Sequence, residues 1–239
     1  MRNRTTRFAT FAATGTAGAA LLVGLAAPGA VATTPTQAPA APQSVVAPAK
    51  LAAKDGKIVP MRQGDTTVDP WHECGPTSVS MALLALGKTP KGWTGEASST
   101  DATVQNMKAS MNETDGGGTM IGQGVEGFKA YGVDAHEEYD LGAAKKAVRD
   151  GKVAIVMGDA QAAAPWWNVN ISPDALSAKT PILHWIVVVD YDADTDEYTV
   201  LDPLSAADAN TPHQVKSSWL DTYYANFADT PGVGSVVAG

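Results

Sequence analysis

The chain has 239 residues, a formal net charge of −8 and a single cysteine. Its 17 lysine and arginine residues form no basic stripe, so the composition argues against nucleic acid as a partner. After the N-terminal region, no run of residues is apolar enough and long enough to span a bilayer.

The N-terminal residues are not expected to belong to the folded domain. Residues 1–32 have the pattern of a secretory signal peptide, with early arginines, an uncharged apolar stretch and the small residues Ala30-Val31-Ala32. We expect cleavage after Ala32 and a secreted, extracellular protein; an uncleaved membrane anchor is the alternative. Residues 33–54 are dominated by Ala, Pro, Thr and Gln, and are expected to be a disordered linker because they cannot form a core.

Residues 55–239 are long enough for one domain with a substantial core. Apolar residues at helical spacing predict helices over 77–86, 102–111, 124–130 and 141–149. Apolar, β-branched runs then predict strands over 152–157, 183–190 and 197–201, the last two joined as a hairpin by an acidic turn. Helices before strands indicate an α+β domain with a helical half and a sheet half.

The lone cysteine, Cys74, comes just before the first predicted helix. Pro76 suits a first helical turn, Val79 and Leu83 mark an apolar face, and Gly87 can end the helix. A thiol at a helix N-terminus faces unpaired N–H groups and the positive end of the helix dipole. Both favour the thiolate, which is the nucleophilic form of cysteine.

A cysteine nucleophile needs a base to take its proton. The chain offers four histidines, which are His72, His136, His184 and His213. His184 is the strongest candidate, because it opens the strand predicted over 183–190, where its ring would be held rigidly. A histidine that is simply hydrogen-bonded within a core is the other interpretation of this position.

Asp202 directly follows the strand predicted over 197–201. Pairing that strand with 183–190 as a hairpin brings their outer ends together, so that His184 and Asp202 become near neighbours. An aspartate beside a histidine fixes the tautomer of the ring and favours imidazolium. The alternative is an aspartate that only ends the sheet before Pro203.

Three motifs occur in the order Cys-Gly-Pro-Thr-Ser, His-Trp-Ile-Val-Val-Val-Asp and Leu-Asp-Pro. This order resembles the papain-like cysteine peptidases related to those that process bacteriocin leader peptides, over about residues 58–203. The resemblance implies a papain-like fold, with a helical lobe that carries the cysteine helix and an antiparallel sheet lobe that carries histidine and aspartate. It implies Cys74 as nucleophile, His184 as general base and acid, and Asp202 as the residue that orients His184.

The same family uses a glutamine upstream of the cysteine to help form the oxyanion hole. The segment Val-Pro-Met-Arg-Gln, which ends at Gln63, is similar to that part of the family, so Gln63 is the candidate donor beside the backbone N–H of Cys74. The separation from Cys74 is longer than the resemblance leads us to expect. Either the intervening loop bulges outward or Gln63 is not the donor.

The implied function is that of a secreted cysteine hydrolase that cleaves a peptide or amide bond through a thioester on Cys74. The family's leader processors are joined to membrane transporters and this chain shows no transporter segment, so cleavage after a double glycine does not carry over. Two alternatives stay open: a catalytically inactive peptide-binding module of the same fold, and an amidase or acyltransferase with the same triad. We expect a peptide or protein substrate, a monomer, no cofactor and no stable membrane association after signal cleavage.

Other patterns are weaker. Residues 122–127 have the glycine spacing of a dinucleotide-binding loop, but no strong strand precedes them. The alternating aspartates of 190–196 lack the glycine and glutamate of a calcium loop and fit a solvated hairpin turn better. His72 and Cys74 have no further metal ligands nearby in the sequence. Trp166-Trp167 are expected in core or interdomain packing, with a place on a cleft rim as the alternative.

Overall fold

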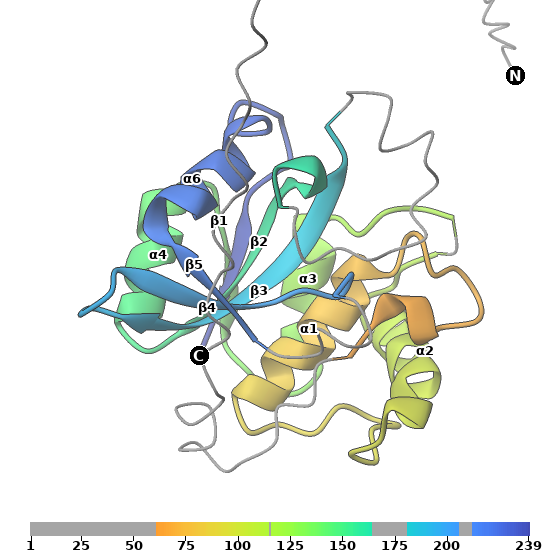
Figure 1. The fold of residues 1–239 in the computed structure, drawn as a ribbon. Helices are drawn as coiled ribbons and strands as arrows, with labels where there is room; N and C mark the ends of the chain where they lie inside the picture. The colour runs from red at the N-terminus through yellow and green to blue at the C-terminus, as the bar shows by residue number, and fades with distance from the viewer. Residues whose placement is uncertain (1–60, 115, 164–180, 206–211) are drawn as a thin grey trace, which may run out of the picture. The chain divides into compact units, whose positions relative to one another are not determined.

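The computed structural model describes residues 61–114, 116–163, 181–205 and 212–239 (Figure 1). The predicted signal peptide at 1–32, the predicted linker at 33–54 and the pair Trp166-Trp167 lie outside the described residues. In chain order the elements are η2 (Gln63–Asp65), α1 (Cys74–Ala85), η3 (Ala97–Ser99), α2 (Thr100–Ser110), α3 (Ile121–Lys129), β1 (Ala135–Glu138), α4 (Leu141–Arg149), β2 (Val153–Asp159), η4 (Ala160–Ala163), β3 (Leu183–Asp192), β4 (Glu197–Leu201), β5 (His213–Lys216), α6 (Ser217–Ala225) and β6 (Ser235–Ala238).

The six strands form one antiparallel sheet in the order β1-β6-β2-β3-β4-β5. The predicted hairpin is confirmed, since β3 and β4 pair from Asp192 opposite Glu197 to Val187 opposite Leu201. All seven residues of β2 are buried. A short run that is apolar throughout is expected for a strand with both of its faces covered.

Helices cover both faces of this sheet. Figure 1 shows α1 and α3 on one side, with α2 beyond α1, and α4 and α6 on the other side. The buried side chains of β3 alternate between the two sides: Trp185 and Val187 pack with α1 and α3, whereas Ile186 and Val188 pack with α4 and α6. The predicted α+β class, with a cysteine-bearing helical part and an antiparallel sheet, is confirmed.

Helix α1 is more deeply buried than its sequence pattern predicts. A helix with one apolar face was expected, but every residue from Gly75 to Leu83 is buried. The expected apolar face packs in the core, and the opposite, hydroxyl-bearing side is covered as well because α1 lies between the sheet and α2. Its serines are satisfied inside the protein: Ser78 Oγ donates to the Trp185 carbonyl at 3.2 Å, and Ser80 Oγ donates to the Pro76 carbonyl at 2.8 Å.

The end of α1 follows the prediction. Gly87 has φ +72°, and its N–H donates to the Leu84 carbonyl at 3.0 Å. The N–H of Lys88 donates to the Leu83 carbonyl at 2.8 Å. These two bonds form the Schellman motif that a glycine beyond the last helical turn makes possible.

The expected order, with helices mostly first and strands mostly last, holds except at two places. Strand β1 precedes α4, and α6 follows β5. Among the α-helices and strands, four were not predicted: helix α6, and the strands β1, β5 and β6, which have only four residues each, too few to display an alternating pattern. Helix α3 also begins at Ile121, three residues before its predicted start.

Candidate active site

Cys74 is the first residue of α1 and a free, half-buried thiol. Pro76 lies in the first helical turn, where its missing N–H has no intrahelical partner to lose. Glu73 precedes the helix, and its carbonyl accepts the N–H of Thr77 at 3.1 Å. The sequence prediction of a cysteine at a helix N-terminus is therefore confirmed.

His184 and Asp202 form a buried pair. His184 Nε2 lies 2.7 Å from Asp202 Oδ1, and the two residues are 2% and 1% exposed. Asp202 Oδ1 also accepts the backbone N–H of Leu204 at 2.8 Å, which fixes the carboxylate. The hairpin of β3 and β4 thus brings the two residues together as the sequence predicts.

The Cys74 thiol is a further hydrogen-bond partner of the His184 ring. Burial lowers the pKa of His184, but the charge and hydrogen bond of Asp202, followed by the hydrogen bond and charge of Cys74, raise it to about 9. An imidazole with this pKa is protonated at neutral pH. A protonated ring between a carboxylate and a thiol is the arrangement that stabilises a thiolate.

Gln63 is buried and lies against the Asp202 end of the sheet. Its backbone N–H donates to the Pro203 carbonyl at 3.0 Å, and its side-chain Nε2 donates to the Pro70 carbonyl at 2.8 Å. Its Oε1 is buried without a hydrogen-bond partner. In the loop that joins Gln63 to Cys74, Trp71 is 52% exposed. The role of Gln63 as an oxyanion donor stays a prediction.

The remaining histidines lie in different surroundings. His213 Nε2 lies 2.9 Å from Ser205 Oγ, and burial lowers the pKa of this ring. His72 is exposed and pairs with Asp69 at 2.8 Å, and His136 is exposed on β1, an edge strand of the sheet. Within the described ranges, no three His, Cys, Asp or Glu side chains come together as ligands for a metal ion.

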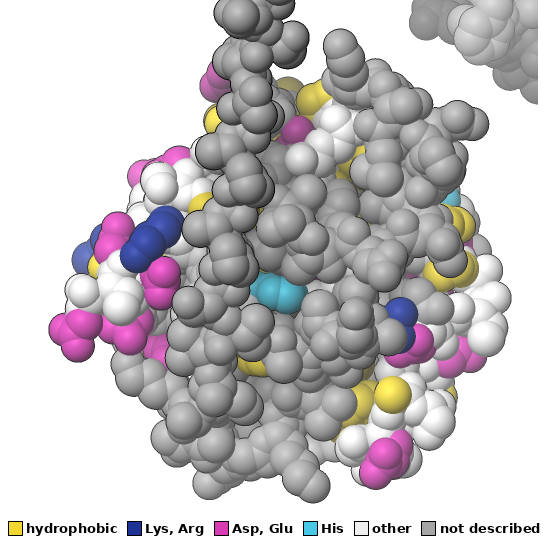
Figure 2. All heavy atoms as spheres, in the orientation of Figure 1, with side chains coloured by type: hydrophobic (Ala, Val, Ile, Leu, Met, Phe, Trp, Pro, Cys, Tyr) yellow, Lys and Arg dark blue, Asp and Glu magenta, His cyan; other side chains and the backbone are white. Residues whose placement is uncertain are grey.

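Two of the weaker sequence patterns, the glycines of 122–127 and the aspartates of 190–196, have ordinary structural roles. The glycines of 122–127 lie within α3, where a Cβ at Gly124 would meet the Trp185 ring at 3.1 Å and one at Gly127 would meet Met111 at 2.9 Å. They allow close helix packing. The turn at 192–196 joins β3 to β4, and Figure 2 shows acidic side chains along the margin where this hairpin lies. Among the described residues, no helix has the length and apolarity to cross a bilayer.

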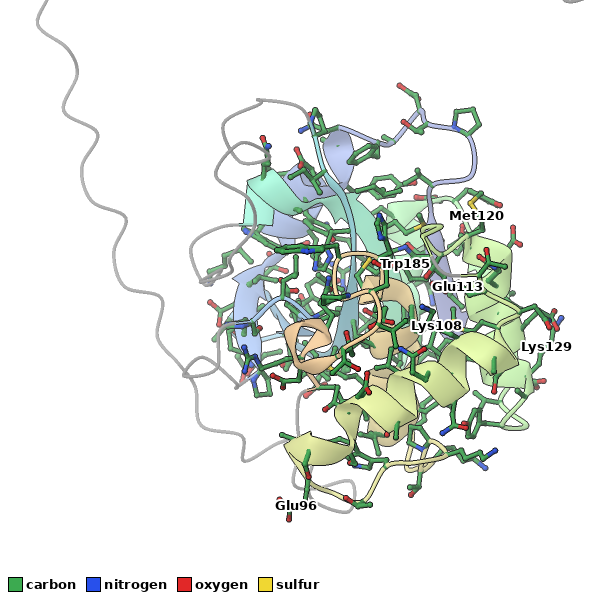
Figure 3. The ribbon with its side chains drawn as sticks, turned by 90° about the vertical axis from the view of Figure 1, so that its right-hand side faces the viewer. Glu96, Lys108, Glu113, Met120, Lys129 and Trp185 are labelled. Carbon is green, nitrogen blue, oxygen red and sulfur yellow. The ribbon has the colours of Figure 1, made fainter. Side chains whose placement is uncertain are left out.

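A buried polar network behind Cys74 was missed by the sequence analysis. Glu113 Oε2 accepts the hydroxyl of Thr119 at 2.7 Å, and Thr119 packs so closely on Gly75 that a Cβ there would lie 1.9 Å from Thr119 Oγ1. Lys108 contributes a positive charge near Glu113. Figure 3 shows Lys108 and Glu113 close together on the side where α2 lies outermost. Distant segments meet here, so no local pattern could reveal the network.

Glu113→Gln is expected to raise the unfolding temperature at pH 8 but not at pH 5. Burial raises the pKa of Glu113 from 4.5 to about 7; the Thr119 hydrogen bond and Lys108 oppose this rise, and the charges of Glu73 and Asp69 add to it. The folded protein therefore keeps a proton that the unfolded chain loses, and stability falls as pH rises from about 4.5 to about 7. Glutamine does not ionise and escapes this loss.

Thermal unfolding of both proteins at the two pH values tests this expectation. Glu126→Gln, a change at an exposed helical glutamate paired with Lys129, is the control and should leave the pH dependence unchanged. Equal temperature differences at pH 5 and pH 8 between wild type and Glu113→Gln would contradict a raised pKa at Glu113.

A cysteine at the start of a buried helix, facing a histidine–aspartate pair held by a β-hairpin, defines the class of papain-like cysteine peptidase folds. Residues 57–231 match the model of the Peptidase_C39 like family, and the chain belongs to this family. The family resemblance seen in the sequence is confirmed.

Two solved structures are similar to the chain at low identity. One is a C39-like peptidase from Bacillus anthracis, with a TM-score of 0.44 and 14% identity over 75% of this chain and 96% of that one. The other is a double-glycine-motif protease of an AMS/PCAT transporter in complex with the leader peptide, with a TM-score of 0.38 and 14% identity over 72% and 88%. No curated protein sequence is significantly similar to the chain.

Proposed function

We propose that this protein is a secreted cysteine peptidase that hydrolyses a peptide or amide bond through a thioester on Cys74. The observation that carries the proposal is the buried contact of 2.7 Å between His184 Nε2 and Asp202 Oδ1, combined with the Cys74 thiol as a further partner of the same ring. A nucleophile, a base and a group that orients the base are the parts that covalent catalysis by cysteine requires.

The proposed reaction has two halves. The Cys74 thiolate attacks the carbonyl carbon, and the backbone N–H of Cys74 and Nε2 of Gln63 hold the oxyanion. The C–N bond breaks as protonated His184 gives its proton to the leaving amine, which leaves a thioester on Cys74. Water then attacks the thioester, His184 takes a proton from it, and the acid product leaves the regenerated thiolate–imidazolium pair.

The pattern at residues 1–32 supports an extracellular site of action. Family membership supports a peptide or protein segment as the substrate, and one structurally similar protease was solved with a leader peptide. We do not propose cleavage after a double glycine for this protein.

The test is hydrolysis of a peptide and amide panel by the mature protein with a fully reduced thiol, with Cys74→Ser as the matched control. The pH dependence of Cys74 alkylation by iodoacetamide is measured beside it, in wild type and in His184→Ala. An unperturbed cysteine thiol titrates near 8.5. We expect the midpoint to be higher in His184→Ala than in wild type, because imidazolium no longer stabilises the thiolate in the variant.

Three outcomes would each contradict a different part of the proposal. A thiol with a midpoint near 8.5 in both proteins, together with no turnover of any substrate, would overturn the proposal in favour of an inactive peptide-binding module. Products that contain an added amine in place of water would replace hydrolysis by acyl transfer. Equal turnover by Cys74→Ser would exclude the thioester route.

A further inference from the structure

Glu73, the residue before the proposed nucleophile, is completely buried, with 0% exposure. A carboxylate is almost never buried in this way unless it is paired. Its backbone carbonyl starts the hydrogen bonding of α1, since it accepts the N–H of Thr77. The position of Glu73 and the position of the Cys74 thiol are therefore fixed together.

The partners of the Glu73 side chain come from α2. Glu73 Oε1 accepts from Lys108 Nζ at 3.1 Å and from Gln105 Nε2 at 2.8 Å, and Lys108 is only 4% exposed. Glu73 Oε2 is buried without a hydrogen-bond partner. The ion pair thus links α2 to the start of α1, in a region where water does not screen its charges.

Several ionisable groups surround the start of α1. The charges of Lys108, Glu73 and Asp69 all act on Glu113, so four ionisable side chains lie near one another there. Lys108 is the cation among them. Removing it would leave the Glu73 carboxylate buried with less compensation, directly adjacent in sequence to the Cys74 thiol, and a negative charge there opposes formation of the thiolate.

We propose that Glu73 and Lys108 are positioning residues for Cys74: their ion pair fixes the first turn of α1 and neutralises the buried carboxylate of the residue that precedes the thiol. This inference rests on the proposed function, in which the Cys74 thiolate is the nucleophile. Lys108 acts on the thiol through Glu73, across the contact between α2 and α1.

Opposite shifts of Cys74 reactivity on changing the two residues would be the signature of this role. In Lys108→Met, we expect alkylation at pH 7 to slow by about tenfold and its pH midpoint to rise, because the buried Glu73 carboxylate loses its counterion and no longer anchors the first turn of α1. In Glu73→Gln, we expect the midpoint to fall, because the negative charge disappears while the shape and the Gln105 contact remain. In the double variant, we expect alkylation within about twofold of wild type.

The control is Lys129→Met, which removes a lysine from an exposed pair with Glu126 on α3 and should change nothing. Shifts of the same sign in both single variants, or unaltered midpoints in variants that are less stable, would overturn the inference and leave the pair with a structural role only. If Lys108→Met does not fold, Glu73→Gln and the double variant still show in which direction the pH midpoint of Cys74 alkylation moves. Failure of the proposed function would show separately, as a wild-type midpoint that does not respond to His184→Ala.

Discussion

Asp202→Ala is expected to lower kcat/KM for peptide hydrolysis by about a thousandfold or more. Asp202→Asn is expected to cost less, because the protonated His184 ring carries an N–H on each nitrogen and can still donate to an amide oxygen. Asp202 Oδ1 accepts from both His184 Nε2 and the Leu204 N–H. An asparagine oxygen at the same place can accept both bonds, so the ring keeps its tautomer and loses only the nearby charge. Alanine removes both acceptor contacts and leaves the buried N–H of Leu204 unpaired, at a cost of about 1–3 kcal/mol of stability.

The pH dependence separates the charge of Asp202 from its geometry. Against the opposing effect of burial, Asp202 makes the largest contribution to raising the pKa of His184 to about 9. A raised histidine pKa contributes stability that is complete below about 6.5 and is lost as pH rises through about 9. In Asp202→Asn we therefore expect the alkaline fall of both activity and stability to move to lower pH. Initial rates and thermal unfolding between pH 5 and pH 10 measure both effects.

Asp159 provides the matched control for Asp202. It is also a buried carboxylate that accepts backbone N–H groups, from Gln161 at 2.9 Å and Ile182 at 3.1 Å. Asp159→Asn should lower stability without changing the pH at which activity falls on the alkaline side. If the activity of Asp202→Asn fell at the same alkaline pH as that of the wild type, this would contradict the role given to the Asp202 charge.

The parts of the site carried by local patterns could be predicted from the sequence. Cys74 stands before a helical repeat that Gly87 ends, and both features lie within one short segment. The His184–Asp202 contact is long-range in space but follows from a simple hairpin, because the acidic turn fixes how β3 and β4 pair. Turn chemistry and strand alternation are enough to specify such a pair.

The parts that depend on packing between distant segments could not be predicted. Glu73 contacts Lys108 only because α2 packs on α1, and no repeat or spacing in the sequence encodes that contact. The burial of both sides of α1 from Gly75 to Leu83 was missed for the same reason, since a helix packed between two layers shows no periodic change between apolar and polar residues. Strands β1, β5 and β6 are held in the sheet by their neighbours rather than by their own four-residue patterns.

Gly158→Ala is expected to destabilise the protein by about 3 kcal/mol or more and to lower activity at the same time. Gly158 lies opposite His184 in the pairing of β2 with β3. A Cβ at Gly158 would lie 2.3 Å from Cδ1 of the Tyr223 ring and 2.5 Å from the Tyr223 carbonyl oxygen. Because one of these atoms is backbone, a change of side-chain rotamer cannot relieve the clash, and α6 must move away from the sheet.

The loss of activity follows from what Tyr223 contacts. This fully buried tyrosine donates its hydroxyl to the His184 carbonyl at 2.8 Å and stacks on Trp219, with ring centroids 5.3 Å apart. Displacement of α6 breaks a bond that holds the backbone of the proposed base. Thermal unfolding should show a fall of roughly 6–12 °C, and kcat should fall more than KM rises, because the change affects the position of His184.

Two further variants separate the packing effect from the hydrogen bond. Tyr223→Phe keeps the ring but removes the hydroxyl, so it should lower kcat with a smaller loss of stability than Gly158→Ala. Gly118→Ala is the control for the glycine change, since a Cβ at Gly118 meets nothing within 4 Å. A Gly158→Ala protein that unfolds at the wild-type temperature would show that α6 is not seated against the sheet at His184.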